Sequence, residues 1–171
     1  SGALLEPLDG QTFVGWPQVE QTSESPEEWL LWYHARDEKD GQVAIGAAAS
    51  ANCIEWEHRG YCLTPGAAGA FDEASVSARC VVRDPASPAR GSGKGWLMYY
   101  EGSDADGRAA IGLARSGDGL VWERASASPV LEPSAEPSAW DGGGVMTPWV
   151  VPLDDGSARM YYVGRALSGA R

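Results

Sequence analysis

The chain has 171 residues, of which 43% are hydrophobic and 22% are charged, proportions that are ordinary for a globular protein and argue against wholesale disorder. Its net charge of −11 argues against nucleic-acid binding, which needs clustered Lys and Arg, and against an anionic membrane surface. No apolar run approaches the ~20 residues of a membrane helix, and we expect no signal or transit segment in the chain as given. The sequence assigns no compartment.

The chain is rich in Gly, Pro and Trp. There are 22 Gly, 11 Pro and 8 Trp but only 2 Phe, which favours many short strands over long helices. Three cysteines cannot form a complete intramolecular disulfide framework, so we expect free or buried thiols, with a single Cys53–Cys62 bridge left open. Two His and no Cys-x-x-Cys argue against a zinc site, and we expect no metal and no cofactor.

An internal repeat organises the chain. The segment 29–33 aligns with 96–100, and 44–46 aligns with 110–112. A further copy restarts at 159–164. Ordered matches of this kind are the sequence signature of a repeat architecture.

Each copy contains strand-like pieces separated by turn signals such as Asp106-Gly107. Four antiparallel strands in each repeating unit describe a β-propeller blade. We therefore predict an all-β fold and a single partial propeller domain over residues 1–171, with about two and a half blades, at 13–58, 75–124 and 144–171. The expected strands of the two fuller blades are 13–20, 29–34, 43–50, 53–57, 76–82, 96–101, 109–115 and 120–124.

Several segments resemble a known superfamily. They are "AIGLARSGDGLVWER", "PVLEPSAEPSAWDGG", "TPWVV" and "RMYYVG". They look like the five-bladed β-propellers of arabinanases, levansucrases and invertases, which include glycoside hydrolase families 32, 43 and 130. The resemblance covers residues 3–165 and implies a five-bladed fold when complete, with activity on a furanoside or mannoside glycan.

In that superfamily the catalytic carboxylates lie at the starts of the first strands, around a central funnel. One carboxylic acid protonates the leaving oxygen, and a second carboxylate attacks or activates water. The corresponding positions here, 15–19, 75–79 and 144–148, contain no Asp or Glu. We expect them to contribute substrate contacts instead, from Trp16, Arg79 and Thr147, and whether the chain is an enzyme stays open.

The end of each second strand should lie on the same face as the start of the first strand. His34, Glu101 and Val163 occupy that place in the three blades. We take Glu101 as a candidate acid and His34 as a candidate donor to a sugar hydroxyl or a phosphate; either is also explained as a solvated strand end.

Three other carboxylates, Asp72, Asp141 and Asp84, are candidates for a catalytic role, and Trp140 is a candidate for substrate binding. Asp72 and Asp141 precede the first strands, where they either line the funnel or cap turns. Asp84 lies in an Arg-Asp-Pro segment that resembles a family 32 motif, but the repeat places it in a turn far from the funnel. Trp140 either stacks on a sugar ring or packs between blades.

Two functions remain open. The first is a glycoside-hydrolase-like propeller that binds or hydrolyses a glycan. The second is a non-catalytic, degenerate propeller that serves as an interaction or structural subunit of a larger assembly. Because half a propeller leaves apolar blade faces uncovered, we also expect either further blades in the natural polypeptide or a protein partner that covers those faces.

Overall fold

The computed structural model describes residues 5–22, 28–85, 95–136 and 138–167 and contains ten strands. There is no helix in these ranges, and hence none long and apolar enough to cross a membrane. The strands are β1 (Gln11–Gln21), β2 (Trp29–Asp37), β3 (Val43–Ser50), β4 (Glu57–Leu63), β5 (Ser75–Arg83), β6 (Trp96–Ser103), β7 (Ala109–Ser116), β8 (Glu123–Arg124), β9 (Gly144–Pro152) and β10 (Ala158–Arg165).

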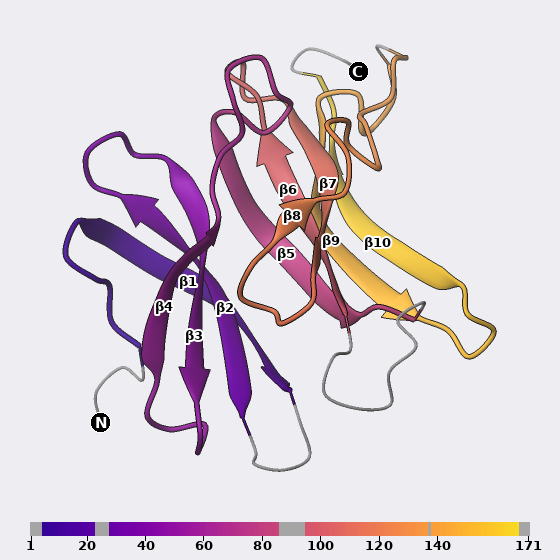
Figure 1. The fold of residues 1–171 in the computed structure, drawn as a ribbon. Helices are drawn as coiled ribbons and strands as arrows, with labels where there is room; N and C mark the ends of the chain where they lie inside the picture. The colour runs from indigo at the N-terminus through magenta and orange to yellow at the C-terminus, as the bar shows by residue number, and fades with distance from the viewer. Residues whose placement is uncertain (1–4, 23–27, 86–94, 137, 168–171) are drawn as a thin grey trace.

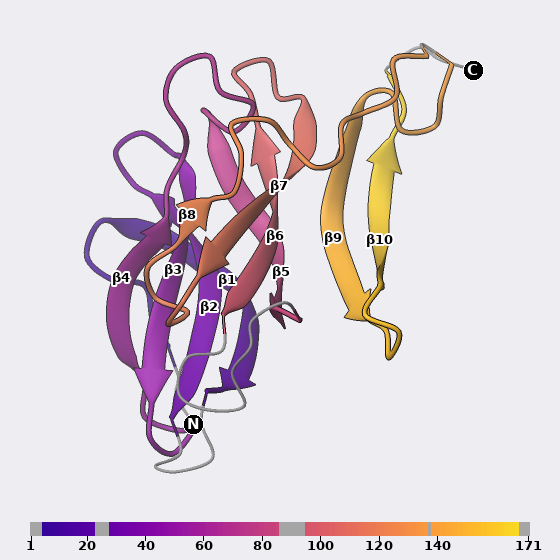
Figure 2. The same ribbon diagram turned by 45° about the vertical axis from the view of Figure 1, so that its right-hand side comes forward.

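The strands form repeated antiparallel units. In the first unit, β1, β2, β3 and β4 pair in chain order, and β5 to β8 repeat the arrangement. The pair β9–β10 begins a third unit and lies at one side of the molecule (Figures 1 and 2). Neighbouring units meet through single parallel pairings, Val43 with Ser75 and Ala109 with Gly144. The fold is therefore an all-β partial propeller, as the sequence predicts.

The predicted blade limits of 13–58, 75–124 and 144–171 stay predictions. Residues 168–171, at the end of the third range, lie outside the described residues.

The main core lies between the first two units. Trp32 on β2 and Trp96 on β6 meet edge to face at 5.3 Å, and both are almost fully buried. The indole Nε1 of Trp32 donates a hydrogen bond of 2.7 Å to the carbonyl oxygen of Gly119. These contacts cross from one unit to the next, so Trp32 and Trp96 pack between the first two blades.

The glycine of the repeated Ile-Gly pair, Gly46 in the first unit and Gly112 in the second, is required by side-chain packing. A Cβ atom added at Gly46 would lie 2.5 Å from the ring of Tyr33, and one at Gly112 would lie 2.4 Å from the ring of Tyr100. Only glycine leaves room for the tyrosine ring that the preceding strand places there.

The fourth strand of the first unit was predicted at 53–57, which is wrong, because β4 begins at Glu57. The expected strand is a tight turn instead. The Ser50 hydroxyl accepts the N–H of Cys53 at 2.9 Å, the Asn52 carboxamide oxygen accepts the N–H of Glu55 at 2.9 Å, and Cys53 has a φ of 58°. Side-chain acceptors of this kind favour turns over a strand ladder.

Candidate functional site

Each first strand carries an irregularity at the same place. The register shifts between Gly15 and Gln18 on β1 and between Ser77 and Cys80 on β5, and β9 has an equivalent shift opposite Tyr161 and Val163. β-bulges of this kind redirect side chains and are frequent beside active sites.

Two of these bulges contain a residue in the left-handed region. Trp16 has a φ of 48° and Thr147 a φ of 51°. Each precedes a proline, a context that favours extended backbone, so the sequence alone predicts an ordinary strand here. Left-handed backbone at a residue other than glycine is costly, and such conformations cluster at ligand-binding and catalytic sites.

The predicted second-strand positions lie opposite the bulges. His34 pairs with Gly15, Glu101 pairs with Ser77, and Val163 pairs with Met146. The three positions therefore share one place in the three units, as the strand topology predicted.

Glu101 joins the second unit to the third. Its Oε2 accepts a hydrogen bond of 3.0 Å from the backbone N–H of Thr147. Burial raises the pKa of the Glu101 carboxyl, although the Thr147 N–H and the positive charge of Arg165 oppose the rise. A carboxyl that retains its proton to higher pH is suited to act as a general acid.

His34 is a buried, neutral imidazole. It is 7% exposed, and burial, together with the charges of Arg79 and Arg36, lowers its pKa to about 4. Its Nδ1 has no hydrogen-bond partner in the described structure. The ring lies 4.6 Å from the Trp16 ring and 5.6 Å from the Phe13 ring, measured between centroids.

Arg79 on β5 contacts the backbone of this aromatic cluster. Its Nη2 donates to the carbonyl oxygens of Trp16 and Trp32, while its Nε has no partner among the described residues. The side chain is 7% exposed, and burial lowers its pKa to about 10. Arg79 was predicted to contact substrate. The structure uses its guanidinium to position the backbone of the Trp16 bulge.

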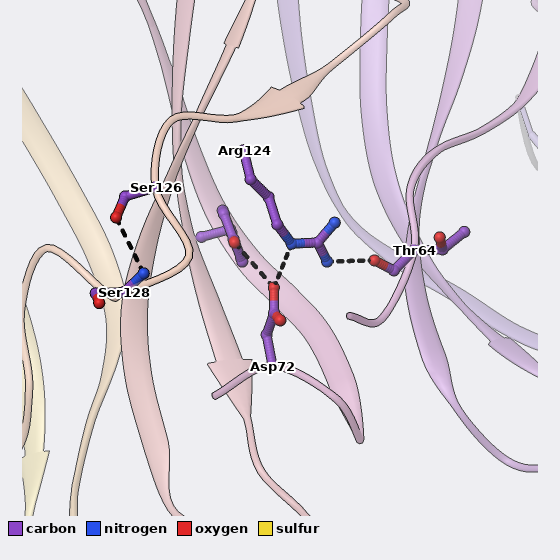
Figure 3. A network of polar contacts seen from close by, with 6 residues as sticks. Thr64, Asp72, Arg124, Ser126 and Ser128 are labelled. Atoms are coloured by element: carbon purple, nitrogen blue, oxygen red, sulfur yellow. Dashed lines mark hydrogen bonds and ion pairs between the residues drawn. The ribbon is translucent and has the colours of Figure 1, made fainter. Parts of the chain in front are cut away.

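Asp72 lies in a buried ion pair. It is 1% exposed, and its Oδ2 accepts hydrogen bonds from the Tyr100 hydroxyl at 2.9 Å and from the Arg124 Nε at 2.8 Å. Arg124 also donates to the Thr64 carbonyl at 2.6 Å, which ties the loop after β4 to β8 (Figure 3). Asp72 therefore has structural contacts, but they differ from the expected turn cap: its Oδ2 binds two side chains, and its Oδ1 has no hydrogen-bond partner among the described residues.

The third unit repeats part of this arrangement. The Tyr162 hydroxyl donates to Asp141 at 3.2 Å, in the same way that Tyr100 donates to Asp72. Trp140 stacks on Tyr162 at 5.5 Å between ring centroids. Asp141 and Trp140 therefore both have scaffold contacts.

Asp84 lies just after β5 and forms an ion pair of 3.2 Å with Arg115 on β7. Asp84 therefore lies at the end of the first strand; most of the segment that follows, residues 86–94, lies outside the described residues, so the assignment of Asp84 to a turn stays a prediction.

Phe13 and Arg165 were not predicted. Phe13 packs beside Trp16 and His34, and Arg165 donates to the carbonyls of Gly143 and Gly107 near Glu101. Phe13 lies at the start of the predicted strand 13–20, and its ring contacts are with Trp16 at the β1 bulge and with His34 on β2. Arg165 lies one residue beyond the predicted copy at 159–164. Arg165 also lines a hollow of about 650 Å³ whose other walls include Arg108 and Gly142. In the described part of the chain, no three His, Cys, Asp or Glu side chains group as metal ligands, and all three cysteines are free.

Comparison with solved structures identifies the class of fold, which is that of propeller glycoside hydrolases and phosphorylases. A structure of an RGII complex of BT0996 superposes with a TM-score of 0.71 at 20% identity, over 98% of this chain and 53% of that one. A glycoside hydrolase superposes with a TM-score of 0.72 at 19% identity, over 97% and 53%. The β-1,2-mannobiose phosphorylase from Listeria innocua, in complex with β-1,2-mannobiose, superposes with a TM-score of 0.68 at 21% identity, over 91% and 42%.

The chain thus spans about half the length of the solved structures it matches. No model of a known protein family matches the chain, and no curated protein matches it.

Proposed function

We propose that this chain forms part of a glycan-binding site in a glycoside-hydrolase-like propeller, and that the site lies along the three first-strand bulges. The observation that carries the proposal is the exposed Trp16 ring, which stands in left-handed backbone against a neutral, buried His34. Trp16 is 63% exposed, so a flat apolar face is available to the C–H groups of a sugar ring. We take a furanoside or mannoside as the substrate class.

Glu101 is the proposed proton donor of this site. Its raised pKa and its place opposite the β5 bulge support that role. Hydrolysis requires a second carboxylate, and the equivalent positions of the other units hold His34 and Val163. Within the described residues, these three positions therefore supply one candidate acid, Glu101, and no second carboxylate to act as nucleophile or base.

That gap favours a second candidate function, a non-catalytic propeller that binds glycan without cleaving it. The two functions differ in what Glu101 does. In the first it transfers a proton to the leaving oxygen, and in the second it only donates or accepts a hydrogen bond.

Titration calorimetry with β-1,2-mannobiose, an arabino-oligosaccharide and a fructo-oligosaccharide tests binding. We expect at least one of them to bind, and Trp16→Ala to weaken that binding about tenfold, equivalent to about 1.4 kcal/mol of lost stacking. Val121→Ala is the matched control, because Val121 is as exposed as Trp16 but lies on the turn before β8. Equal affinities for the two variants would remove Trp16 from the site.

Release of reducing sugar from the bound glycan then separates the two functions. If the chain is a hydrolase, Glu101→Gln abolishes turnover while the affinity changes little. If no sugar is released by the parent chain although the glycan binds, the non-catalytic function stands.

A further inference from the structure

Two arginines line the hollow beside β7, β9 and β10. Arg108 comes directly before β7, and Arg165 is the last residue of β10. Strand pairing brings them together, because Ala109 pairs with Gly144 and Gly144 pairs with Arg165. The volume of the hollow, about 650 Å³, lies in the range of ligand-binding clefts.

The backbone holds the Arg165 guanidinium in place. Its Nε and Nη2 donate to the Gly143 carbonyl oxygen at 3.3 Å and 2.9 Å, and Nη2 also donates to the Gly107 carbonyl oxygen at 2.8 Å. The remaining nitrogen, Nη1, makes no hydrogen bond to any described residue. A guanidinium that is already fixed loses little conformational entropy when it binds a ligand.

Arg108 presents its whole guanidinium to the hollow's surroundings. The residue is exposed, and its side chain forms no hydrogen bond or ion pair within the part of the chain that the structure describes. Its backbone N–H donates to the Asp104 carboxylate at 2.8 Å, so Asp104 fixes the turn before β7 and leaves the Arg108 side chain unpaired.

The charges of the lining favour an anion. Arg108 and Arg165 carry two positive charges, and Asp106 carries one negative charge without forming an ion pair with either arginine. Neighbouring guanidinium groups repel one another, and an anion between them replaces that repulsion by attraction. The chain as a whole has a net charge of −11, so this excess of positive charge is local.

The hollow adjoins the proposed proton donor. Glu101 accepts the N–H of Thr147, which lies three residues after β9 begins at Gly144. The positive charge of Arg165 also opposes the rise in the pKa of the Glu101 carboxyl. A sugar residue held in the hollow would therefore neighbour the sugar residue at Glu101.

We propose that this hollow binds the carboxylate of a uronic acid residue in the glycan, between the guanidinium groups of Arg108 and Arg165. Guanidinium groups recognise carboxylates through charge-assisted hydrogen bonds of fixed geometry. The inference rests on the proposed function and narrows its substrate class. A mannuronic acid glycan meets both conditions, because mannuronic acid is mannose with a carboxylate in place of the C6 hydroxymethyl group.

Titration calorimetry with a mannuronic acid disaccharide and the mannobiose of the same linkage tests the proposal, since the two differ only in the carboxylates. We expect the parent chain to bind the acidic disaccharide about tenfold more tightly, with a preference that shrinks as ionic strength rises. Arg108→Gln should remove the preference. Arg159→Gln removes the same charge from an exposed position near the start of β10 and should retain it. Circular dichroism checks that both variants are folded.

Inorganic phosphate is the third probe and distinguishes a free anion from a sugar carboxylate. We expect it to bind at least tenfold more weakly than the acidic disaccharide. Phosphate that binds as tightly as that disaccharide, and is lost in Arg108→Gln, would overturn the proposal.

Other results separate this inference from the proposed function. If both disaccharides bind the parent chain equally, or if the Arg108 and Arg159 variants behave alike, the hollow does not bind a sugar carboxylate, while the glycan site at the bulges stands. If neither disaccharide binds, the inference falls, and the neutral oligosaccharides of the first panel show whether the proposed function falls with it.

Discussion

Arg79 on β5 donates a hydrogen bond to the carbonyl oxygen of Trp16 on β1, so the second unit fixes the bulge of the first. The same Nη2 reaches the Trp32 carbonyl on β2, which places one buried cation at the junction of three strands. In the equivalent positions of β1 and β9 the chain has Pro17 and Pro148, so this junction belongs to one unit alone.

Arg79→Met should destabilise the fold and weaken glycan binding together. The variant keeps an unbranched but shorter side chain and loses both hydrogen bonds, each of which is worth about 1.5–3 kcal/mol when a charged donor is involved. Urea denaturation measures the stability, and calorimetry measures the affinity. Arg59→Met is the control: its ion pair with Glu57 is exposed, and its loss should cost less than about 1 kcal/mol. If Arg79→Met matched this control, the guanidinium would have no positioning role.

Asp72→Ala should be far more damaging than Asp141→Ala. The first change leaves the Arg124 guanidinium without its anion in a largely buried place, at a cost of about 3 kcal/mol. The second removes one hydrogen bond from Tyr162, at a cost of about 1 kcal/mol. Thermal unfolding of the two variants measures the difference, and equal losses would contradict the structural role given to the Asp72 ion pair.

Cys53→Gly should stabilise the protein by about 1 kcal/mol. Cys53 has a φ of 58°, and the equivalent turn before β8 has Gly119, with a φ of 81°, at that place. A glycine relieves the left-handed strain that a Cβ atom causes. Ala51→Gly, two residues away and without positive φ, should instead lower stability or leave it unchanged. A loss of stability in both variants would show that Cys53 is unstrained.

His34 should make the fold sensitive to mild acid. Its folded-state pKa of about 4 lies below the ordinary value of 6.5, so the unfolded chain takes up the proton first as the pH falls. The stability from neutral His34 is therefore fully present above pH 6.5 and is lost as the pH falls through 4, by about 3 kcal/mol at most.

Denaturation of the parent chain and of His34→Gln between pH 7 and pH 4 isolates this contribution. The parent should lose more stability over that interval than the variant does. NMR provides an independent measurement, since the His34 ring signals should stay those of the neutral form to about pH 4. Titration near 6.5 would contradict the buried placement.

Much of the fold was predictable because the residues that repeat along the sequence are the buried residues of the strands. The alignment of 29–33 with 96–100 placed the second strands of two units correctly. The repeated Ala-Ile-Gly placed their third strands, because equivalent residues pack and pair in the same way in each unit. The fourth strand of the first unit was misplaced because Ser50 and Asn52 form a turn whose hydrogen bonds come from side chains.

The candidate site was predictable only in part. Strand topology placed His34 and Glu101 opposite the first strands, because antiparallel pairing determines which residues face one another. The left-handed backbone at Trp16 and Thr147 was not predictable, since both precede proline. Asp72 was ambiguous in the sequence because its partners, Tyr100 and Arg124, are distant along the chain.

The most direct test of the glycan-binding site is a crystal structure of the chain with a bound oligosaccharide from the calorimetric panel. The account predicts a sugar ring over the exposed face of Trp16 and a sugar hydroxyl within hydrogen-bond distance of Glu101. Sugar bound only in the hollow beside Arg108 and Arg165, or anywhere away from the bulges of β1, β5 and β9, would contradict it.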